Sequence, residues 1–219
     1  MIQIDGDRLN ATLQELAAIG ATPNAGVTRL TLTDEDKTAR DLLAKWMIGA
    51  GLEVKVDDLG NMSGVRPGTD DLPPVYMGSH IDTVVRGGKY DGALGVMGAL
   101  EVIRTLNDHG VQTRMPVGLI NWTNEEGVRF EPATLASGVV AGAFSREYAY
   151  ALRDRNGLTF GDELERIGYK GDEANRPLPA SAYLELHIEQ GPVLESAGKQ
   201  VGVVGGIVGI IWNEVVVIG

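Results

Sequence analysis

Apolar side chains recur every three or four residues in two stretches near the start of the chain. The first stretch lies between Asp5 and Gly20, and the second lies between Thr33 and Gly51. A side chain that can cap a helix stands ahead of each stretch, and Asp36 completes a capping-box pattern with Thr33. A glycine follows each stretch, as is typical of helix C-termini. We therefore predict two amphipathic helices.

After Gly51 the pattern changes to that of strands. Residues 52–56 alternate between apolar and charged side chains, and Gly60-Asn61 predicts a turn into a second short strand at 62–65. The following pattern predicts, in order, strand 75–78, helix 93–106, strand 117–122, helix 160–167 and strand 183–188. This alternation indicates an α/β fold with a mixed, partly parallel sheet flanked by helices.

The last segments of the chain are apolar and carry no turn signal after them. A short turn or helix at 192–196 leads to strand patterns at 201–204 and 207–218. A strand needs partners for its backbone amides and carbonyls, and none follows the last one. We therefore expect 207–219 to begin a second domain whose remainder is absent from this chain.

Composition and charge narrow the classes of partner. The chain has 19 Lys and Arg residues against 30 Asp and Glu residues, a net charge of −11, so we expect no nucleic-acid or membrane partner. Because there is no cysteine, any metal must be held by His, Asp and Glu. The N-terminus has no secretory pattern and no long uncharged apolar run occurs, which predicts a cytoplasmic protein.

Polar clusters directly follow three of the predicted strands, at 78–82, 121–127 and 185–191. In open α/β sheets the carboxyl ends of strands border the ligand-binding crevice, so we expect these clusters to converge. Two of the three histidines, His80 and His187, fall in them. The third, His109, stands at the end of the helix predicted from 93, just before Gly110, where a structural role is expected.

His80 and Asp82 stand two residues apart on an extended segment, so both side chains can face the same side. Asp82 can then accept the ring N–H of His80 while the other ring nitrogen binds a metal. The same pair can instead be a buried histidine with its carboxylate partner. Asp91, just before the helix predicted at 93, can likewise be a helix cap instead of a ligand. The pattern leaves these interpretations open.

Glu125 and Glu126 form an acidic doublet after a predicted strand, which is commonly a solvated loop pair. His187 can similarly be a hydrogen-bonded core imidazole. A metal-bound water, however, needs one carboxylate to hold the cation and another to take the proton. Two strand-end histidines beside these acids favour a metal site over separate structural roles.

Three strings carry a family resemblance: GSHIDTVVRGGKYDGALGV, NWTNEEGVRF and LELHIEQGPVLE. They resemble the di-zinc amidohydrolases and peptidases related to aminoacylase and carboxypeptidase G. Within that family the resemblance is to the hydantoinase/carbamoylase branch, which contains N-carbamoyl-L-amino-acid hydrolases, allantoate amidohydrolases and β-ureidopropionases. HIEQGP is the most branch-specific string, because the peptidase branches tend to carry an acidic ligand where this chain has His187. The resemblance implies a di-zinc exopeptidase-like catalytic domain.

The resemblance implies two divalent metal ions, zinc or manganese, with cobalt and nickel also suited to such ligands. It implies that His80, Asp91 and His187 bind one metal. Asp91 is implied to bridge to a second metal that Glu126 also binds. The first metal then has its three protein ligands in this chain, whereas the second has only Asp91 and Glu126.

The resemblance also implies hydrolysis of a linear amide or ureido C–N bond in a small molecule, as in N-carbamoyl-L-amino acids or allantoate. Glu125 is implied as the general base that takes a proton from a water shared by the metals and later returns it to the leaving nitrogen. Asp82 is implied as the partner of His80, and Gln190 as a substrate contact. A carbamoyl amino acid would yield the free amino acid, carbon dioxide and ammonia.

Members of the family are considerably longer than this chain. Their next segments form a smaller α+β lid and dimerisation domain, and a late histidine completes the second metal site. We accordingly assign 1–206 to an incomplete catalytic metal-binding domain and 207–219 to the first strand of the lid domain. We expect the full-length protein to be a homodimer and this truncated chain to turn over substrate negligibly by itself. Two alternatives stay open: a metal-binding or interaction module without hydrolytic activity, and a dipeptidase-type metallopeptidase.

Overall fold

The computed structural model describes residues 2–207 together with 209, 215 and 217. The chain divides into two compact units, Met1–Ile188 and Glu189–Gly219. The second unit contains helix α7 (Val193–Ser196), where the Glu189 carboxylate accepts the N–H groups of Val193 and Leu194, each at 3.0 Å. Most of the strand predicted at 207–218 lies outside the described residues.

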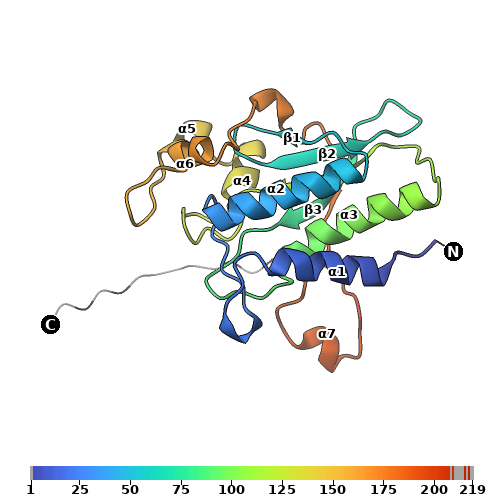
Figure 1. The fold of residues 1–219 in the computed structure, drawn as a ribbon, viewed down its shortest axis with the longest axis horizontal. Coiled ribbons are helices and arrows are strands. Elements are labelled where there is room, and N and C mark those ends of the chain that lie inside the picture. The colour runs from blue at the N-terminus through green and yellow to red at the C-terminus, as the bar shows by residue number, and fades with distance from the viewer. Residues whose placement is uncertain (1, 208, 210–214, 216, 218–219) are drawn as a thin grey trace. The chain divides into compact units, whose positions relative to one another are not determined.

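The strands of the first unit form one mixed, five-stranded sheet (Figure 1). In chain order they are β1 (Lys55–Val56), β2 (Met62–Arg66), β3 (Val75–His80), β4 (Val117–Trp122) and β5 (Ala182–Leu184). Their spatial order is β1-β2-β4-β3-β5, with β2 antiparallel to both of its neighbours and β3 parallel to both β4 and β5. The predicted mixed, partly parallel sheet is confirmed.

Helices α1 (Gly6–Ala17), α2 (Asp34–Gly49) and α3 (Ala93–Asp108) lie over one face of this sheet (Figure 1). Asp5 caps α1 by accepting the N–H of Arg8 at 2.9 Å, and Thr33 caps α2 by accepting the N–H of Asp36 at 3.3 Å. Helix α3 connects the parallel strands β3 and β4, a connection that needs a crossover. His109 is the C-cap of α3, which agrees with its predicted place at the helix end.

The segment 131–182, in which the pattern predicts only a helix at 160–167, folds into several short helices. They are α4 (Leu135–Val140), α5 (Arg146–Ala151), α6 (Phe160–Arg166) and the 3-10 turn η2 (Glu173–Asn175); a further 3-10 turn, η1 (Pro23–Ala25), precedes α2. The predicted helix is confirmed as α6, which packs Phe160 edge-on against Phe130 with ring centroids 5.4 Å apart. None of the helices in the described part of the chain has the length and apolarity needed to cross a membrane.

Three strand predictions need correction. Residues 52–54 are unpaired because Leu52 donates its N–H to the carbonyl of Met47 at 3.0 Å and completes the end of α2, so β1 begins only at Lys55. Strand β5 ends at Leu184, four residues before the predicted end. Residues 201–204 form no strand, since they are exposed and pair with no strand of the described chain.

A buried ion pair ties α2 to the sheet. Arg40 Nε donates to Asp36 Oδ2 at 2.8 Å, and both side chains are fully buried. The same guanidinium donates to the carbonyl of Gly60 at 2.7 Å and to Thr123 Oγ1 at 3.2 Å. Arg40 therefore links α2 both to the turn before β2 and to the residue that follows β4.

We expect Arg40→Met to lower the free energy of unfolding by about 3–5 kcal/mol, because the change leaves the Asp36 carboxylate buried without its counter-charge. Asp36→Leu should lower the free energy of unfolding by a similar amount, because it leaves the Arg40 guanidinium buried without its counter-charge. The double variant should lose less than the sum of the two single losses. Urea unfolding of the four proteins measures these values, and strictly additive losses would show that the pair is not coupled.

Candidate metal centre

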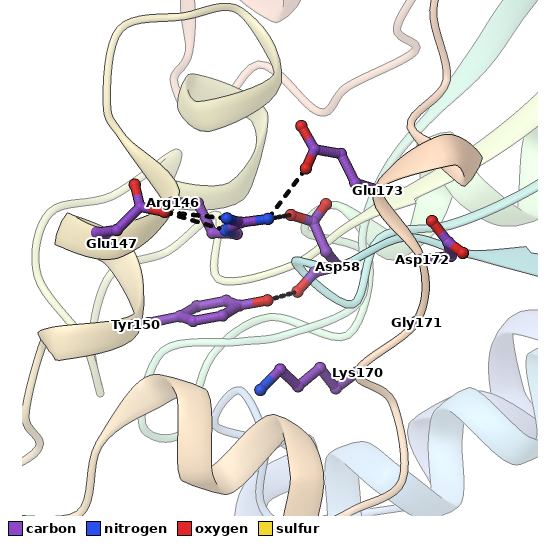
Figure 2. A pocket seen from close by; sticks show the side chains of 8 residues that line it. All are labelled: Asp58, Arg146, Glu147, Tyr150, Lys170, Gly171, Asp172 and Glu173. Atoms are coloured by element: carbon purple, nitrogen blue, oxygen red, sulfur yellow. Dashed lines mark hydrogen bonds and ion pairs between the residues drawn. The ribbon is translucent and has the colours of Figure 1, made fainter.

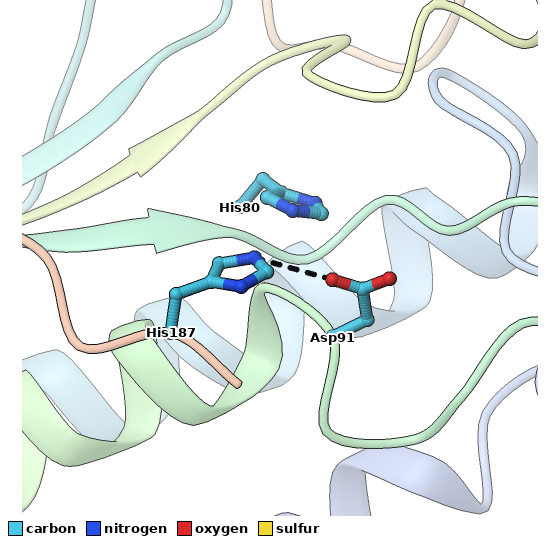
Figure 3. Close-up of side chains that lie close together, drawn as sticks. All are labelled: His80, Asp91 and His187. Carbon is cyan, nitrogen blue, oxygen red and sulfur yellow. Dashed lines mark ion pairs between the residues drawn. The ribbon is translucent and has the colours of Figure 1, made fainter. Parts of the chain in front are cut away.

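Three metal-ligating side chains meet beside the N-terminus of α3. His80 is the last residue of β3, Asp91 lies just before α3, and His187 follows β5 (Figure 3). If one ligand atom is taken from each residue, all three atoms lie within 4.8 Å of one another. His187 Nε2 is 3.2 Å from Asp91 Oδ1, and the two imidazole rings are stacked at 6.2 Å between centroids. The predicted convergence of these residues is present in the structure.

Both histidines turn the Nε2 atom of the ring toward the carboxylates of this centre. His80 Nδ1 lies 2.9 Å from the carbonyl oxygen of Asp82, and His187 Nδ1 lies 2.8 Å from that of Ile188. A carbonyl oxygen can only accept a hydrogen bond, so Nδ1 carries the hydrogen in both rings. In the neutral imidazole the lone pair is then on Nε2, the atom that faces the carboxylates. The two rings are oriented as metal ligands.

The backbone at Gly92 makes room for His80. Gly92, and not Asp91, is the N-cap of α3, and it has a φ of 61°. A Cβ atom at Gly92 would lie 2.4 Å from His80 Nε2, so only glycine allows the imidazole to pack against the start of the helix. The side chain of Asp91, the residue before this cap, faces His187. The N-cap position of α3 is therefore Gly92, and the Asp91 carboxylate lies in the candidate metal centre.

Asp82 organises the acidic pair. Its two carboxylate oxygens accept the backbone N–H groups of Glu125 and Glu126, each at 3.2 Å. The Asp82 carboxylate is 3.6 Å from His80 Nδ1, which donates instead to the Asp82 carbonyl at 2.9 Å. The ring N–H of His80 is thus donated to the backbone carbonyl of Asp82 and not to its carboxylate as predicted, and the carboxylate chiefly fixes the loop after β4.

The two glutamates take different positions in the centre. Glu125 Oε2 lies 3.4 Å from His80 Nε2, with a third of the side chain exposed. Glu126 Oε1 is buried and has no hydrogen-bond partner among the residues that the structure describes. A buried carboxylate oxygen without a donor is costly unless a cation or water satisfies it. The donor set and this oxygen therefore fit divalent metal ions.

Burial controls the protonation of this cluster. It raises the pKa of Glu125, of Asp82 and of Glu126, the last to about 7. Burial lowers the pKa of His80, but the nearby carboxylates of Asp82 and Glu125 outweigh it and raise that pKa overall. Without a cation, the centre therefore retains protons that metal binding must displace.

Two further residues near the centre had no role assigned to them from the sequence. Arg29 is 2% exposed and donates from Nε to the carbonyl of Ile81 at 2.8 Å, which fixes the backbone between His80 and Asp82. Glu185 lies two residues before His187 and accepts the hydroxyl of Ser79 at 2.5 Å. Gln190, the predicted substrate contact, belongs to the second compact unit, so its role stays a prediction.

A cavity of about 640 Å³ lies elsewhere in the first unit, between α5 and the segment 170–173 (Figure 2). Three of its charged side chains pair with one another: Arg146 contacts Glu173 at 2.9 Å and Glu147 at 3.0 Å. Tyr150 also lines it and donates its hydroxyl to the carbonyl of Asp58 at 2.7 Å. None of the metal-centre residues lines this cavity.

The sheet and the His/Asp/His cluster define an α/β protein with a candidate metal centre. Residues 76–216 match the sequence profile of peptidase family M20/M25/M40, and the chain belongs to this family. The resemblance predicted from the three strings is confirmed.

Individual relatives carry more specific names. The chain is 51% identical to an N-carbamoyl-L-amino-acid amidohydrolase of Rhizobium meliloti, over 99% of this chain and 52% of that protein. It is 37% identical to a ureidoglycolate hydrolase of Arabidopsis thaliana, over 94% and 45% of the two chains. The crystal structure of an amidase of the hydantoinase/carbamoylase family from Burkholderia vietnamiensis is 53% identical, with a TM-score of 0.88 over 90% of this chain and 48% of that one. The chain spans about half the length of the relatives it matches.

We expect Gly92→Ala to weaken metal binding by at least tenfold, because the new methyl group displaces the His80 ring. Gly88→Ala, in the same loop, is the matched control, since a Cβ there meets no atom within 4 Å and the backbone is not strained. Calorimetric titration of both variants with Zn²⁺ measures the difference. Equal affinities would show that His80 does not bind the cation.

Metal affinity should rise with pH through about 7, because His80 has a raised pKa and Glu126 has a pKa of about 7, so both hold protons at mildly acidic pH. Each displaced proton weakens binding roughly tenfold per pH unit below its pKa. Titrations with Mn²⁺ at about pH 6 and pH 8, in buffers of different ionisation enthalpy, report affinity and proton release together. An affinity independent of pH would contradict this assignment of ligands.

Proposed function

We propose that the protein to which this chain belongs hydrolyses a linear ureido C–N bond with the help of divalent metal ions. The observation that carries the proposal is the meeting of one ring nitrogen of each histidine and one Asp91 carboxylate oxygen within 4.8 Å, with Glu125 beside His80. Relatives that are named as N-carbamoyl-L-amino-acid amidohydrolases and ureidoglycolate hydrolases support the bond type. Both names denote small substrates that contain a ureido group.

We assign two cations to the centre, zinc or manganese, with cobalt and nickel as chemically suitable replacements. His80, Asp91 and His187 would hold the first, and Asp91 with Glu126 would hold the second. When bound, such cations polarise a carbonyl group and lower the pKa of water. The second site needs at least one more ligand, which we place in the half of the relatives that this chain does not span.

Glu125 is the residue we assign to proton transfer. Its carboxylate is one-third exposed and adjoins His80 Nε2, so it can reach both a water in the centre and the leaving nitrogen of a substrate. Burial raises its pKa, which favours a carboxylate that accepts a proton and then releases it. Asp82 holds the backbone of Glu125 in place, and Gln190 would contact substrate.

The substrate class we propose is an N-carbamoyl-L-amino acid or a related ureido acid, which includes allantoate. We also propose that 1–206 belongs to the catalytic domain and that 207–219 begins a lid and dimerisation domain of a homodimer. The length of the relatives, about twice that of this chain, supports both assignments.

The test joins this chain to the second half of the Rhizobium meliloti relative and measures release of amino acids from N-carbamoyl-L-amino acids with added Mn²⁺ or Zn²⁺. We expect turnover by the joined protein and negligible turnover by the 219-residue chain alone. Glu125→Gln in the joined protein should lower kcat by about 10²–10⁴-fold, because it removes the group that moves the proton.

The same samples decide between the proposal and its rivals. Unchanged metal binding by Glu125→Gln, measured by calorimetry, would separate proton transfer from metal ligation. Robust turnover by the chain alone would overturn the claim that further ligands are needed. Tight metal binding without hydrolysis in the joined protein would favour a metal-binding module, and cleavage of dipeptides instead of carbamoyl amino acids would favour a peptidase.

A further inference from the structure

His187 stands beyond the hydrogen-bond ladder of the described sheet. Strand β5 ends at Leu184, which pairs with Met77, and His187 follows three residues later. Its side chain is 32% exposed, whereas that of His80 is 2% exposed. Packing in the core therefore holds His80 in place, whereas His187 needs a different constraint.

Glu185 supplies a link between the ends of three strands. Its Oε1 accepts the hydroxyl of Ser79 at 2.5 Å, and its Oε2 accepts the hydroxyl of Tyr183 at 2.8 Å. The Tyr183 oxygen in turn accepts the indole N–H of Trp122 at 3.0 Å. One carboxylate thus joins the segment after β5 to residues near the ends of β3 and β4.

The backbone after Glu185 is held close to α3. A Cβ atom at Gly95 would lie 2.8 Å from the carbonyl oxygen of Leu186 and 2.7 Å from Ser79 Cβ. The absence of a side chain at Gly95 therefore lets the segment 185–187 approach the first turn of α3. Asp91, the partner of His187, lies directly before that turn.

We propose that Glu185 is a positioning residue for the metal centre: its bonds to Ser79 and Tyr183 hold His187 against His80 and Asp91. The proposal rests on the metal centre of the proposed function. Hydrogen bonds to a charged carboxylate are stronger than those between neutral groups. The bonds from Glu185 to Ser79 and Tyr183, here called the anchor, can therefore fix the segment 185–187, which the hydrogen-bond ladder of the sheet does not reach.

This role differs from a contribution to the fold. Glu185 is exposed, so its replacement leaves no charge stranded in the core. Ser79 and Tyr183 keep their backbone places in β3 and β5 when only their hydroxyl groups are removed. The effect of breaking the anchor should appear in metal affinity and not in the stability of the metal-free protein.

The experiment titrates the 219-residue chain with Zn²⁺ by calorimetry. Glu185→Gln keeps the size of the side chain and removes its charge, and we expect affinity to fall by about 10–100-fold. Ser79→Ala and Tyr183→Phe should each produce part of that loss. Ser79→Ala combined with Glu185→Gln should be no weaker than Glu185→Gln alone, because both changes break the same bond.

Two controls separate the anchor from general effects. Glu53→Gln changes the net charge equally at an exposed site outside the centre and should leave affinity unchanged. Urea unfolding without metal should give the same midpoint for all variants, and the visible absorption of bound Co²⁺ should change only in those that break the anchor.

The outcomes are distinct. Wild-type affinity in Glu185→Gln would overturn the role of Glu185 and leave the proposed function intact. A loss in Glu185→Gln without any loss in Ser79→Ala and Tyr183→Phe would also overturn it, since the carboxylate would then act directly. A loss of unfolding stability that matches the loss of affinity would reduce Glu185 to a structural residue. An unmodified chain that binds no metal would overturn the centre itself, and the role of Glu185 with it.

Discussion

The metal centre depends on the two hydrogen bonds that the Asp82 carboxylate accepts from the amides of Glu125 and Glu126. Strands β3 and β4 are parallel neighbours, so the ladder brings their ends together but leaves the direction of each following loop undetermined. The buried Asp82 carboxylate fixes that direction for both loops at once. It aims one glutamate at His80 and buries an oxygen of the other, so the two acids acquire separate tasks.

This arrangement concentrates unfavourable electrostatics in one place. Asp82, Glu125 and Glu126 are like charges in a partly buried cluster, and burial raises the pKa of each. The rest of the first unit supplies the rigidity that keeps them together. Arg40 connects α2 to Thr123, directly before the acidic loop, and Arg29 holds the carbonyl of Ile81 inside the segment that carries His80. Divalent cations would relieve the repulsion that the fold maintains.

Sequence pattern was sufficient where a single period or a short-range contact decides the structure. The caps at Asp5 and Thr33 and the helix at 160–167 are of this kind. It was insufficient where tertiary contacts decide the structure. The pattern does not show that β5 ends at Leu184. In the sequence, Arg40 and Asp36 look like an ordinary surface pair on a helix, although the pair is buried. The positions of polar residues after the predicted strands located the clusters, yet the need for Gly92 beneath the His80 ring follows only from three-dimensional contact.

The three ligands of the first metal also differ in how the chain delivers them. His80 and Asp91 come from the end of β3 and the start of α3, so forming that short connection brings both to one place. His187 arrives about a hundred residues later, three residues beyond β5, a strand of three residues that are all exposed. A cation that binds all three ligands would therefore stabilise chiefly the attachment of β5, because binding favours the conformation that completes the site. The exposed edge strand β5 and the last ligand of the centre would thereby be coupled, so metal occupancy and the order of this edge should change together.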